Sequence, residues 1–233
     1  MTKVYFSCDE IPRDWGRYSS LCNALETRLE TLDHPPKTET LNTWRVNTPK
    51  GFAFLLHAHR DVVCGLTEAA ATGKIRLDDA TRRGWDATIA QAEALAAKAI
   101  VIQTPHGFSP NQTSRAQLDE LAKELLPNWN RPVIWEPQGM WDPILTRSFA
   151  AERGLILAYD PFIALREEEG LGKGDAAFVI NERAGMRREF DRWDFSSLLD
   201  ELRSHNRAFC LLRGQFKWRH ATLFRELLDE PSP

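Results

Sequence analysis

The chain has 233 residues, 42% of them hydrophobic, which is enough to bury one large core or two small ones. Its formal net charge of -3 provides no overall positive field, so the composition argues against nucleic acid or an anionic membrane as a partner. The four cysteines are scattered without a C-x-x-C pair, there is no signal peptide, and no apolar run approaches ~18 residues. These features predict a cytoplasmic protein with reduced thiols that does not enter a membrane.

The amino-terminal part of the chain alternates strand and helix patterns. Residues 3–8 predict a short strand and residues 15–21 a short helix. Residues 22–31 alternate apolar and polar side chains, which predicts a second strand with Glu26 and Arg28 on its polar face. In a barrel, this polar face would point into the lumen instead of into water.

The most informative segment is residues 48–60, T-P-K-G-F-A-F-L-L-H-A-H-R, which follows a predicted helix at residues 38–46. Its proline and glycine predict a turn, and the apolar residues after them predict a strand that ends in two histidines. Because side chains alternate along a strand, Leu55, His57 and His59 are expected on one face. Polar residues at the C-terminal end of a buried strand are typical of the sites of barrel enzymes.

The rest of the chain continues the alternation of apolar strands with amphipathic helices. Residues 78–98 carry apolar side chains at helical spacing. Ser114-x-x-Gln117 resembles a capping box that opens the next helix, and Asp142-Pro143 opens another. The remaining predicted strands are residues 99–103, 132–136, 155–159, 176–181 and 208–213, and the remaining predicted helices are residues 194–205 and 216–228.

Eight strands that alternate with helical segments predict a parallel sheet covered by helices. Eight such units predict an α/β fold of the (β/α)8 TIM-barrel type, a single domain over residues 1–233 with a frayed tail at residues 229–233. A doubly wound open sheet is the alternative. The sequence contains neither G-x-G-x-x-G nor G-x-x-x-x-G-K-[ST], which argues against the nucleotide-binding form of that alternative.

Polar residues gather at the C-terminal ends of most predicted strands, which is the end where TIM-barrel enzymes carry their sites. The candidate catalytic residues have side chains that can transfer protons, and they are Glu26, His57, His59 and Glu136. The candidate ligand-binding residues are Arg28, Gln103, His106, Asp160, Asn181 and Arg213. The competing interpretation is an ion network in which the arginines neutralise the carboxylates.

Two kinds of chemistry fit these residues. His57 and His59, together with a strand-end carboxylate, form a nitrogen and oxygen ligand set for a divalent metal such as zinc or manganese. Without a metal, Glu26 and Glu136 would act as a carboxylate pair in acid-base catalysis, while the histidines or Arg213 hold an anionic ligand. Both interpretations predict a small-molecule ligand. The sequence does not indicate the substrate, the metal or the oligomeric state.

Four pieces of the sequence resemble a single family: L-C-N-A-L-E-T, T-L-N-T-W-R-V-N-T-P-K-G-F-A-F, I-V-I-Q-T-P-H-G-F and W-E-P-Q-G-M-W. They resemble strands two to five of the domain of unknown function 72, the YecE-like TIM-barrel family. Glu26, Gln103 and Glu136 fall on positions of the family pattern, and the likeness extends over residues 3–226. The resemblance implies a TIM-type barrel.

Other positions depart from the family pattern, so the chain resembles a diverged member. Arg28 replaces an asparagine of the pattern, His57 a lysine, Pro137-Gln138 an Arg-His pair, and Arg213 the first of two asparagines. The family has no settled activity. The functional expectation is a hydrolase or lyase that acts on a small polar or phosphorylated ligand. The alternatives are an inactive barrel that binds a ligand or partner, and a nucleic-acid-binding or endonuclease-like barrel.

Overall fold

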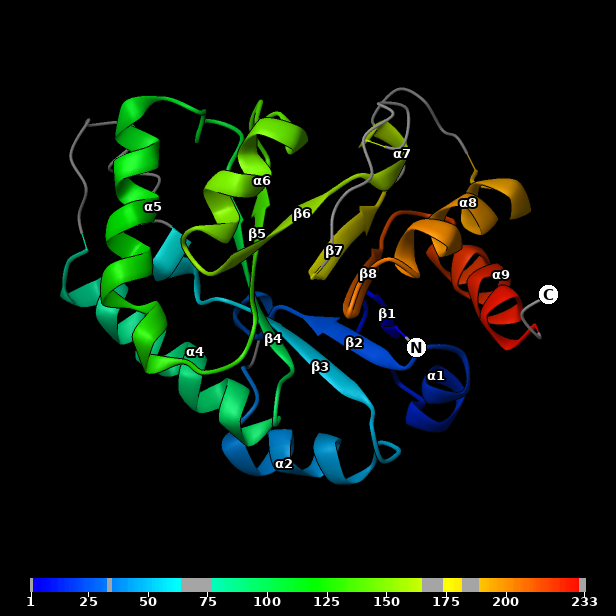
Figure 1. The fold of residues 1–233 in the computed structure, drawn as a ribbon. Helices are drawn as coiled ribbons and strands as arrows, with labels where there is room; N and C mark the ends of the chain where they lie inside the picture. The colour runs from blue at the N-terminus through cyan, green and yellow to red at the C-terminus, as the bar shows by residue number, and fades with distance from the viewer. Residues whose placement is uncertain (1, 33–34, 64–76, 165–173, 182–188, 231–233) are drawn as a thin grey trace. The chain divides into compact units, whose positions relative to one another are not determined.

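The computed structural model describes residues 2–32, 35–63, 77–164, 174–181 and 189–230 (Figure 1). Residues 231–233 of the predicted tail lie outside the described residues. The strands are β1 (Lys3–Cys8), β2 (Ala24–Thr27), β3 (Ala53–His57), β4 (Ala99–Thr104), β5 (Val133–Pro137), β6 (Leu155–Tyr159), β7 (Asp175–Ile180) and β8 (Arg207–Leu212). The described helices are α1 (Trp15–Leu21), α2 (Thr38–Val46), α4 (Asp79–Ala94), α5 (Gln112–Glu124), α6 (Pro143–Ala151), α7 (Pro161–Ala164), α8 (Arg192–Leu202) and α9 (Lys217–Asp229), with 3-10 turns η1 (Leu29–Thr31) and η2 (Leu126–Asn128).

The strands follow the order β1-β8-β7-β6-β5-β4-β3-β2 in an eight-stranded sheet. Strand pairs such as β1 with β8 and β4 with β5 run parallel, and helical segments separate each strand from the next in the chain. This succession is that of a (β/α)8 barrel, so the predicted fold class is confirmed. The extent of the predicted single domain, residues 1–233, stays a prediction.

The chain forms two compact units, which are described separately. Unit 1 contains residues 1–26, 48–53 and 158–233, and unit 2 contains residues 27–47 and 54–157. Unit 1 therefore brings together segments from the beginning and the end of the sequence, whereas unit 2 comes from its middle.

Unit 1 is built on the parallel strands β1, β8 and β7 and on the helices α8 and α9, which lie side by side (Figure 1). Phe6 of β1 packs edge-on against Phe224 of α9, with ring centroids 5.2 Å apart. Phe224 also contacts Phe195 of α8 at 5.5 Å. All three rings are fully buried, and aromatic contacts of this kind add to the free energy that burial supplies.

Unit 2 is built on the parallel strands β3, β4 and β5 with helices α4 and α5. The indole of Trp85 on α4 is fully buried, and its Nε1 donates a hydrogen bond to the carbonyl of Leu125, just beyond α5, at 2.9 Å. Trp135 of β5 is also buried and donates from Nε1 to Thr104 Oγ1 at 3.1 Å. Each buried indole thus has an acceptor for its polar N–H, which avoids the cost of an unsatisfied donor.

The beginning of α5 differs from the prediction. Asn111 is the N-cap, because its side chain accepts a hydrogen bond from the backbone N–H of Ser114 at 2.9 Å. The helix therefore begins at Gln112, and Ser114 and Gln117 lie buried within it. The predicted Ser114-x-x-Gln117 capping box is wrong because Asn111, three residues earlier, is the N-cap and places Ser114 within the first turn of the helix.

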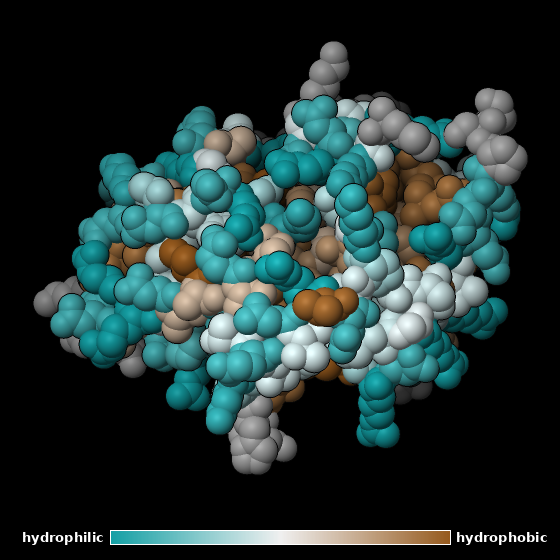
Figure 2. Space-filling view, turned by 90° about the horizontal axis from the view of Figure 1, so that it is seen from below, coloured by the Kyte–Doolittle hydropathy of each residue, from teal (hydrophilic) through white to brown (hydrophobic). Residues whose placement is uncertain are grey.

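Hydrophilic side chains predominate on the face of the protein drawn in Figure 2, with apolar side chains visible in separate patches. Among the described residues, the large apolar side chains that are mostly exposed are Val46, Met140 and Trp193. Within the described ranges, no helix combines the length and the apolar character that crossing a membrane requires.

Candidate functional site

The centre of the candidate site is the carboxylate of Glu136, near the C-terminal end of β5 in unit 2. Its Oε1 accepts hydrogen bonds from Nε2 of Gln103 at 2.8 Å and from Nε2 of Gln138 at 2.7 Å. Gln103 lies beside Glu136 in the register of β4 with β5, and Gln138 follows β5 directly. Only 2% of Glu136 is exposed. The two neutral amides therefore orient a carboxylate that is screened from bulk water.

His57 lies close to this carboxylate. It is the last residue of β3 and is buried, and one of its ring nitrogens lies within 4.8 Å of a carboxylate oxygen of Glu136. Because β3 pairs with β4 and β4 with β5, three neighbouring strands supply His57, Gln103 and Glu136 at the same end of the sheet. A histidine and a carboxylate at this spacing can coordinate one divalent ion, or exchange protons with a ligand held between them.

The turns after β4 and β5 pack against each other and support Glu136. Trp141 donates from Nε1 to the carbonyl of Phe108 at 2.5 Å, and the two rings stack with centroids 5.9 Å apart. The backbone N–H of Gln138 donates to the carbonyl of Thr104 at 3.0 Å. Gly139 approaches so closely that a Cβ atom there would stand 2.6 Å from the Phe108 carbonyl oxygen. Only glycine allows this approach, so the turn that carries Gln138 depends on it.

Sequence reasoning did not include Gln138 and Gly139 among the site residues. The signal for Gln138 is its spacing from Glu136. Side chains two residues apart in an extended chain point to the same side, so Gln138 is expected on the side of Glu136. The signal for Gly139 is weaker, since a glycine after a strand is most often a turn residue.

His59 is placed differently from His57. Because β3 ends at His57, the alternation of side chains does not extend to His59. The backbone N–H of His59 donates to Thr88 Oγ1 at 2.9 Å. The Nδ1 atom of His59 lies so close to Gly84 that a Cβ atom added there would stand 3.4 Å from it. Thr88 and Gly84 both belong to α4. The ring also lies 3.5 Å from the Asp61 carboxylate. His59 therefore packs against the helix, and it provides a matched control for His57.

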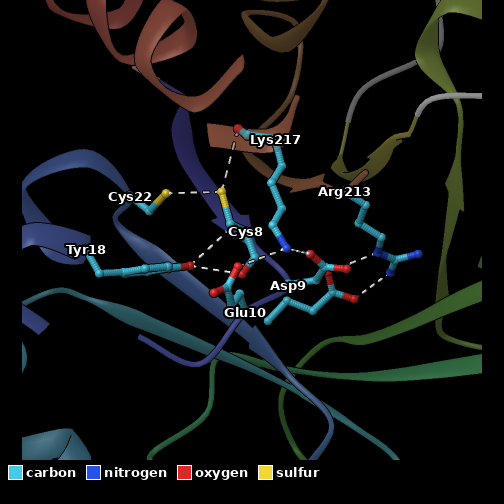
Figure 3. A network of polar contacts seen from close by, with 8 residues as sticks. Cys8, Asp9, Glu10, Tyr18, Cys22, Arg213 and Lys217 are labelled. Carbon is cyan, nitrogen blue, oxygen red and sulfur yellow. Dashed lines mark hydrogen bonds and ion pairs between the residues drawn. The ribbon is translucent and has the colours of Figure 1, made fainter. Parts of the chain in front are cut away.

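Unit 1 contains the other predicted catalytic carboxylate, Glu26 of β2, and pairs it with Arg213. Nε of Arg213 donates to Oε2 of Glu26 at 3.1 Å, and Nη2 donates to Oε1 at 2.5 Å (Figure 3). The side chains are only 9% and 1% exposed, respectively. Such a two-point contact matches the guanidinium fork to both carboxylate oxygens. For Glu26, this is the pairing that the ion-network interpretation predicts.

A second ion cluster of unit 1 centres on Lys217, the first residue of α9. Its Nζ lies 2.9 Å from Asp9 Oδ1 and 3.3 Å from Glu10 Oε2 (Figure 3). Burial alone would lower the pKa of Lys217, but the hydrogen bonds and negative charges of Asp9 and Glu10 outweigh it and raise the pKa. The ammonium group is therefore held in its charged form.

The other predicted ligand-binding residues lie in varied surroundings. In unit 1, Asp160 accepts a hydrogen bond on Oδ1 from the backbone N–H of Phe162 at 2.9 Å, which stabilises the start of α7, and Asn181 is exposed just after β7. In unit 2, Arg28 is half-buried before η1, and His106 is exposed in the turn after β4. Their predicted roles in ligand binding stay predictions.

Comparison with known proteins identifies relatives by sequence and by structure. Residues 13–152, which are more than half of the chain, match the family model described as Protein of unknown function DUF72. No functionally curated protein matches the chain.

Solved structures share the fold at low sequence identity. A DUF72 family protein from Thermotoga maritima MSB8 is 15% identical, with a TM-score of 0.70 and coverage of 98% of this chain and 100% of that one. A DUF72 family protein from Enterococcus faecalis V583 is 13% identical, with a TM-score of 0.68 and 99% coverage of both chains. A xylose isomerase domain containing protein from Salmonella typhimurium LT2 is 10% identical, with a TM-score of 0.59 and coverage of 96% and 94%. At these identities the likeness demonstrates the fold alone.

Proposed function

The chain belongs to the DUF72 family of proteins of unknown function, and within that barrel family we propose that it is a hydrolase or lyase for a small polar or phosphorylated ligand. His57 and Glu136 are its acid-base pair. The observation that carries the proposal is the setting of Glu136, which is buried beside His57 and held by the amides of Gln103 and Gln138. The amides of Gln103 and Gln138 fix the orientation of this buried carboxylate without taking part in proton transfer, which suits a group that exchanges protons with a bound ligand.

The roles follow from the donor and acceptor capacity of each group. Glu136 can take a proton from a hydroxyl group or a bound water, and His57 can give a proton to the leaving oxygen. Gln103 and Gln138 are positioning residues, because they hold the carboxylate without exchanging protons. The same nitrogen and oxygen donors of His57 and Glu136 fit a zinc or manganese ion, which would supply charge stabilisation at the reacting oxygen.

The class of ligand is inferred from the polarity of these groups and from a relative. Hydroxyl-rich molecules offer the donors and acceptors that a histidine, a carboxylate and two amides can bind. One structural relative is named for a xylose isomerase domain, which makes sugars and sugar phosphates the first molecules to test. The overall charge of -3 gives no support to the nucleic-acid alternative.

The test measures metal content and activity in three variants. Elemental analysis of protein purified without chelator measures the metal content. A screen of sugar phosphates, in which product formation is followed by NMR, should find activity in the wild type. The substitutions His57→Ala and Glu136→Gln should each lower kcat/KM by about a hundredfold or more, which is a typical loss for an acid-base residue. His59→Ala, which removes a ring packed on α4, should retain activity within a few fold.

Equal losses in His57→Ala and His59→Ala would contradict the proposal, as would full activity in Glu136→Gln. A stoichiometric metal that disappears in His57→Ala, but not in His59→Ala, would assign the pair as metal ligands. Folding of each variant is checked by its circular dichroism spectrum and by its unfolding midpoint.

One observation favours a second function, a barrel that binds a ligand without transforming it. Glu26, a predicted catalytic residue, is bound on both oxygens by Arg213, so its charge is already neutralised. Isothermal titration with the molecules of the same screen distinguishes the two functions. Binding that requires His57 and Glu136, without any product, would favour the binding protein over the enzyme.

A further inference from the structure

Two buried cysteines of unit 1 face each other. Cys8 is the last residue of β1, and Cys22 follows the last residue of α1. Both side chains are fully buried, and their Sγ atoms lie 3.8 Å apart (Figure 3). The acid-base chemistry proposed above uses neither thiol.

Tyr18 of α1 connects the chain segments that carry the two thiols. Its hydroxyl accepts a hydrogen bond from the Cys8 backbone N–H at 3.0 Å and lies 2.8 Å from the carbonyl of Ala24, to which it donates. The backbone N–H of Cys22 donates to the carbonyl of Tyr18 at 2.8 Å. Cys8 is further held by the register of β1 with β8, where it pairs with Leu212. These contacts hold the backbone segments that carry Cys8 and Cys22 close to each other.

The two thiols are electrostatically unequal. The hydrogen bond from the Cys8 thiol lowers the pKa of Cys22 and outweighs the opposing effect of burial. The same bond, with burial, raises the pKa of Cys8. The Cys8 sulfur also lies 3.8 Å from the carbonyl of Lys217, so the single proton of the Cys8 thiol has two alternative acceptors, this carbonyl and the Cys22 sulfur. Of the two thiols, Cys22 is thus the one that ionises more readily, and a lowered thiol pKa beside a second thiol is typical of reactive dithiols.

We propose that Cys8 and Cys22 are a redox-active dithiol that hydroperoxides convert into an intramolecular disulfide. The proposal depends on unit 1 alone and is independent of the function proposed for His57 and Glu136.

The reaction balances with a hydroperoxide as the oxidant. The Cys22 thiolate attacks the terminal peroxide oxygen, the S–O bond forms and the O–O bond breaks. The leaving hydroxide, or alkoxide when the hydroperoxide is organic, takes up the proton that Cys22 had released. Cys8 then attacks the Cys22 sulfur, the S–S bond forms, and the S–O bond breaks. The second hydroxide leaves as water with the proton of Cys8. The two sulfurs together lose two electrons, which the peroxide gains.

A pocket of unit 1 is lined by neighbours of the two cysteines, although neither cysteine lines it. Its volume is about 410 Å³, and Tyr18, Leu21 and Trp218 are among its lining residues. Tyr18 binds the backbone of Cys8, Leu21 precedes Cys22, and Trp218 follows Lys217. Hydrogen peroxide needs little more room than water, so a small opening between α1 and α9 would admit it.

The experiment maps disulfides in the folded full-length chain. Reduced protein is treated with hydrogen peroxide, alkylated and digested with trypsin, which separates Cys8 on the peptide 4–13 from Cys22 on the peptide 18–28. The expected result is a linked pair of these peptides, an intact mass lower by about 2 Da, and full reversal by dithiothreitol. Cys210→Ala is the matched control, because Cys210 is a buried thiol of the same unit, and it should leave the linkage unchanged.

Single variants identify the attacking sulfur. In Cys8→Ser, the sulfenic acid on Cys22 should persist and react with dimedone. In Cys22→Ser, labelling of Cys8 should fall at least tenfold below that level. The proposal is overturned if the two peptides stay unlinked in the native protein, or if they become linked only after unfolding in urea. Stronger dimedone labelling of Cys22→Ser than of Cys8→Ser would likewise overturn the assigned roles.

Discussion

Glu26 in unit 1 and Glu136 in unit 2 are both buried glutamates on strands, but their partners differ. Glu26 is bound by the guanidinium of Arg213, whereas Glu136 accepts hydrogen bonds from two neutral amides. A guanidinium compensates a buried negative charge, and an amide only orients it. The ion pair of Glu26 is thus of the kind that stabilises a fold, whereas the amide-held carboxylate of Glu136 is the one that we propose for acid-base chemistry.

The largest expected effect on stability appears when Glu26 and Glu136 are each replaced by glutamine and the two variants are compared. Glu26→Gln leaves the guanidinium of Arg213 buried without its counter-charge, so we expect a loss of about 3–5 kcal/mol in the free energy of unfolding. Glu136→Gln keeps a side chain of the same shape whose amide oxygen can still accept hydrogen bonds from Gln103 and Gln138, so we expect a change of only about 1 kcal/mol. Urea denaturation, monitored by tryptophan fluorescence, measures both values.

The opposite order of stability losses would contradict the contrast between the two glutamates. A stability loss in Glu136→Gln as large as that in Glu26→Gln would make both carboxylates structural. The double variant Glu26→Gln/Arg213→Met serves as the control. It should regain part of the loss, because it removes the uncompensated guanidinium.

A smaller effect is expected at Gly139, which supports only the glutamate of unit 2. In Gly139→Ala, the new Cβ would meet the carbonyl oxygen of Phe108 at 2.6 Å, so one of the two turns must shift. We expect a loss of about 1–3 kcal/mol in stability, as for other overpacked sites. Ligand or metal binding should weaken as well, because Gln138 moves away from Glu136. Gly107→Ala is the control, since nothing lies within 4 Å of a Cβ atom there.

The smallest expected effect is a pH dependence that belongs to unit 1. The raised pKa of Lys217 means that its ion pairs stabilise the fold below the ordinary lysine value of 10.5 and lose this contribution as the pH rises through the higher folded value. Lys217→Met should therefore lower the free energy of unfolding by about 0.5–1 kcal/mol at pH 8, a value that allows for solvent screening. The difference between the two proteins should shrink above pH 10.5. Unfolding midpoints of both proteins at pH 8, 9.5 and 11 check it. A difference that stays constant to pH 11 would assign the effect to packing.

The sequence predicted the fold where local patterns decide it. The observed bounds of β6 and α1 are those predicted from residues 155–159 and 15–21. β6 is an apolar run that ends at Asp160-Pro161, and a proline directly after an apolar run leaves few other positions at which the strand could end. By contrast, β2 covers only Ala24–Thr27 of the predicted residues 22–31, because the chain turns into η1 at Leu29. Alternation alone does not record where tertiary contacts end a strand.

The candidate site was predicted in part for a related reason. The sequence placed Gln103 and Glu136 at strand ends, but their hydrogen bond depends on the register between strands that are 33 residues apart. Arg28 and Arg213 were equally plausible partners for the carboxylates by sequence. The contact between Arg213 and Glu26 follows from folding of segments 187 residues apart, which no local pattern encodes.

The construction of unit 1 from both ends of the sequence also bears on the order of events during synthesis. β1 leaves the ribosome early, but its hydrogen-bonding neighbour β8 begins at Arg207. Unit 2 has all of its residues available once residue 157 has been made. The middle of the chain can therefore condense first, while the apolar edge of β1 waits for nearly the whole polypeptide. An exposed strand edge is a template for pairing with other chains, so slow translation of the last third would raise the chance of aggregation.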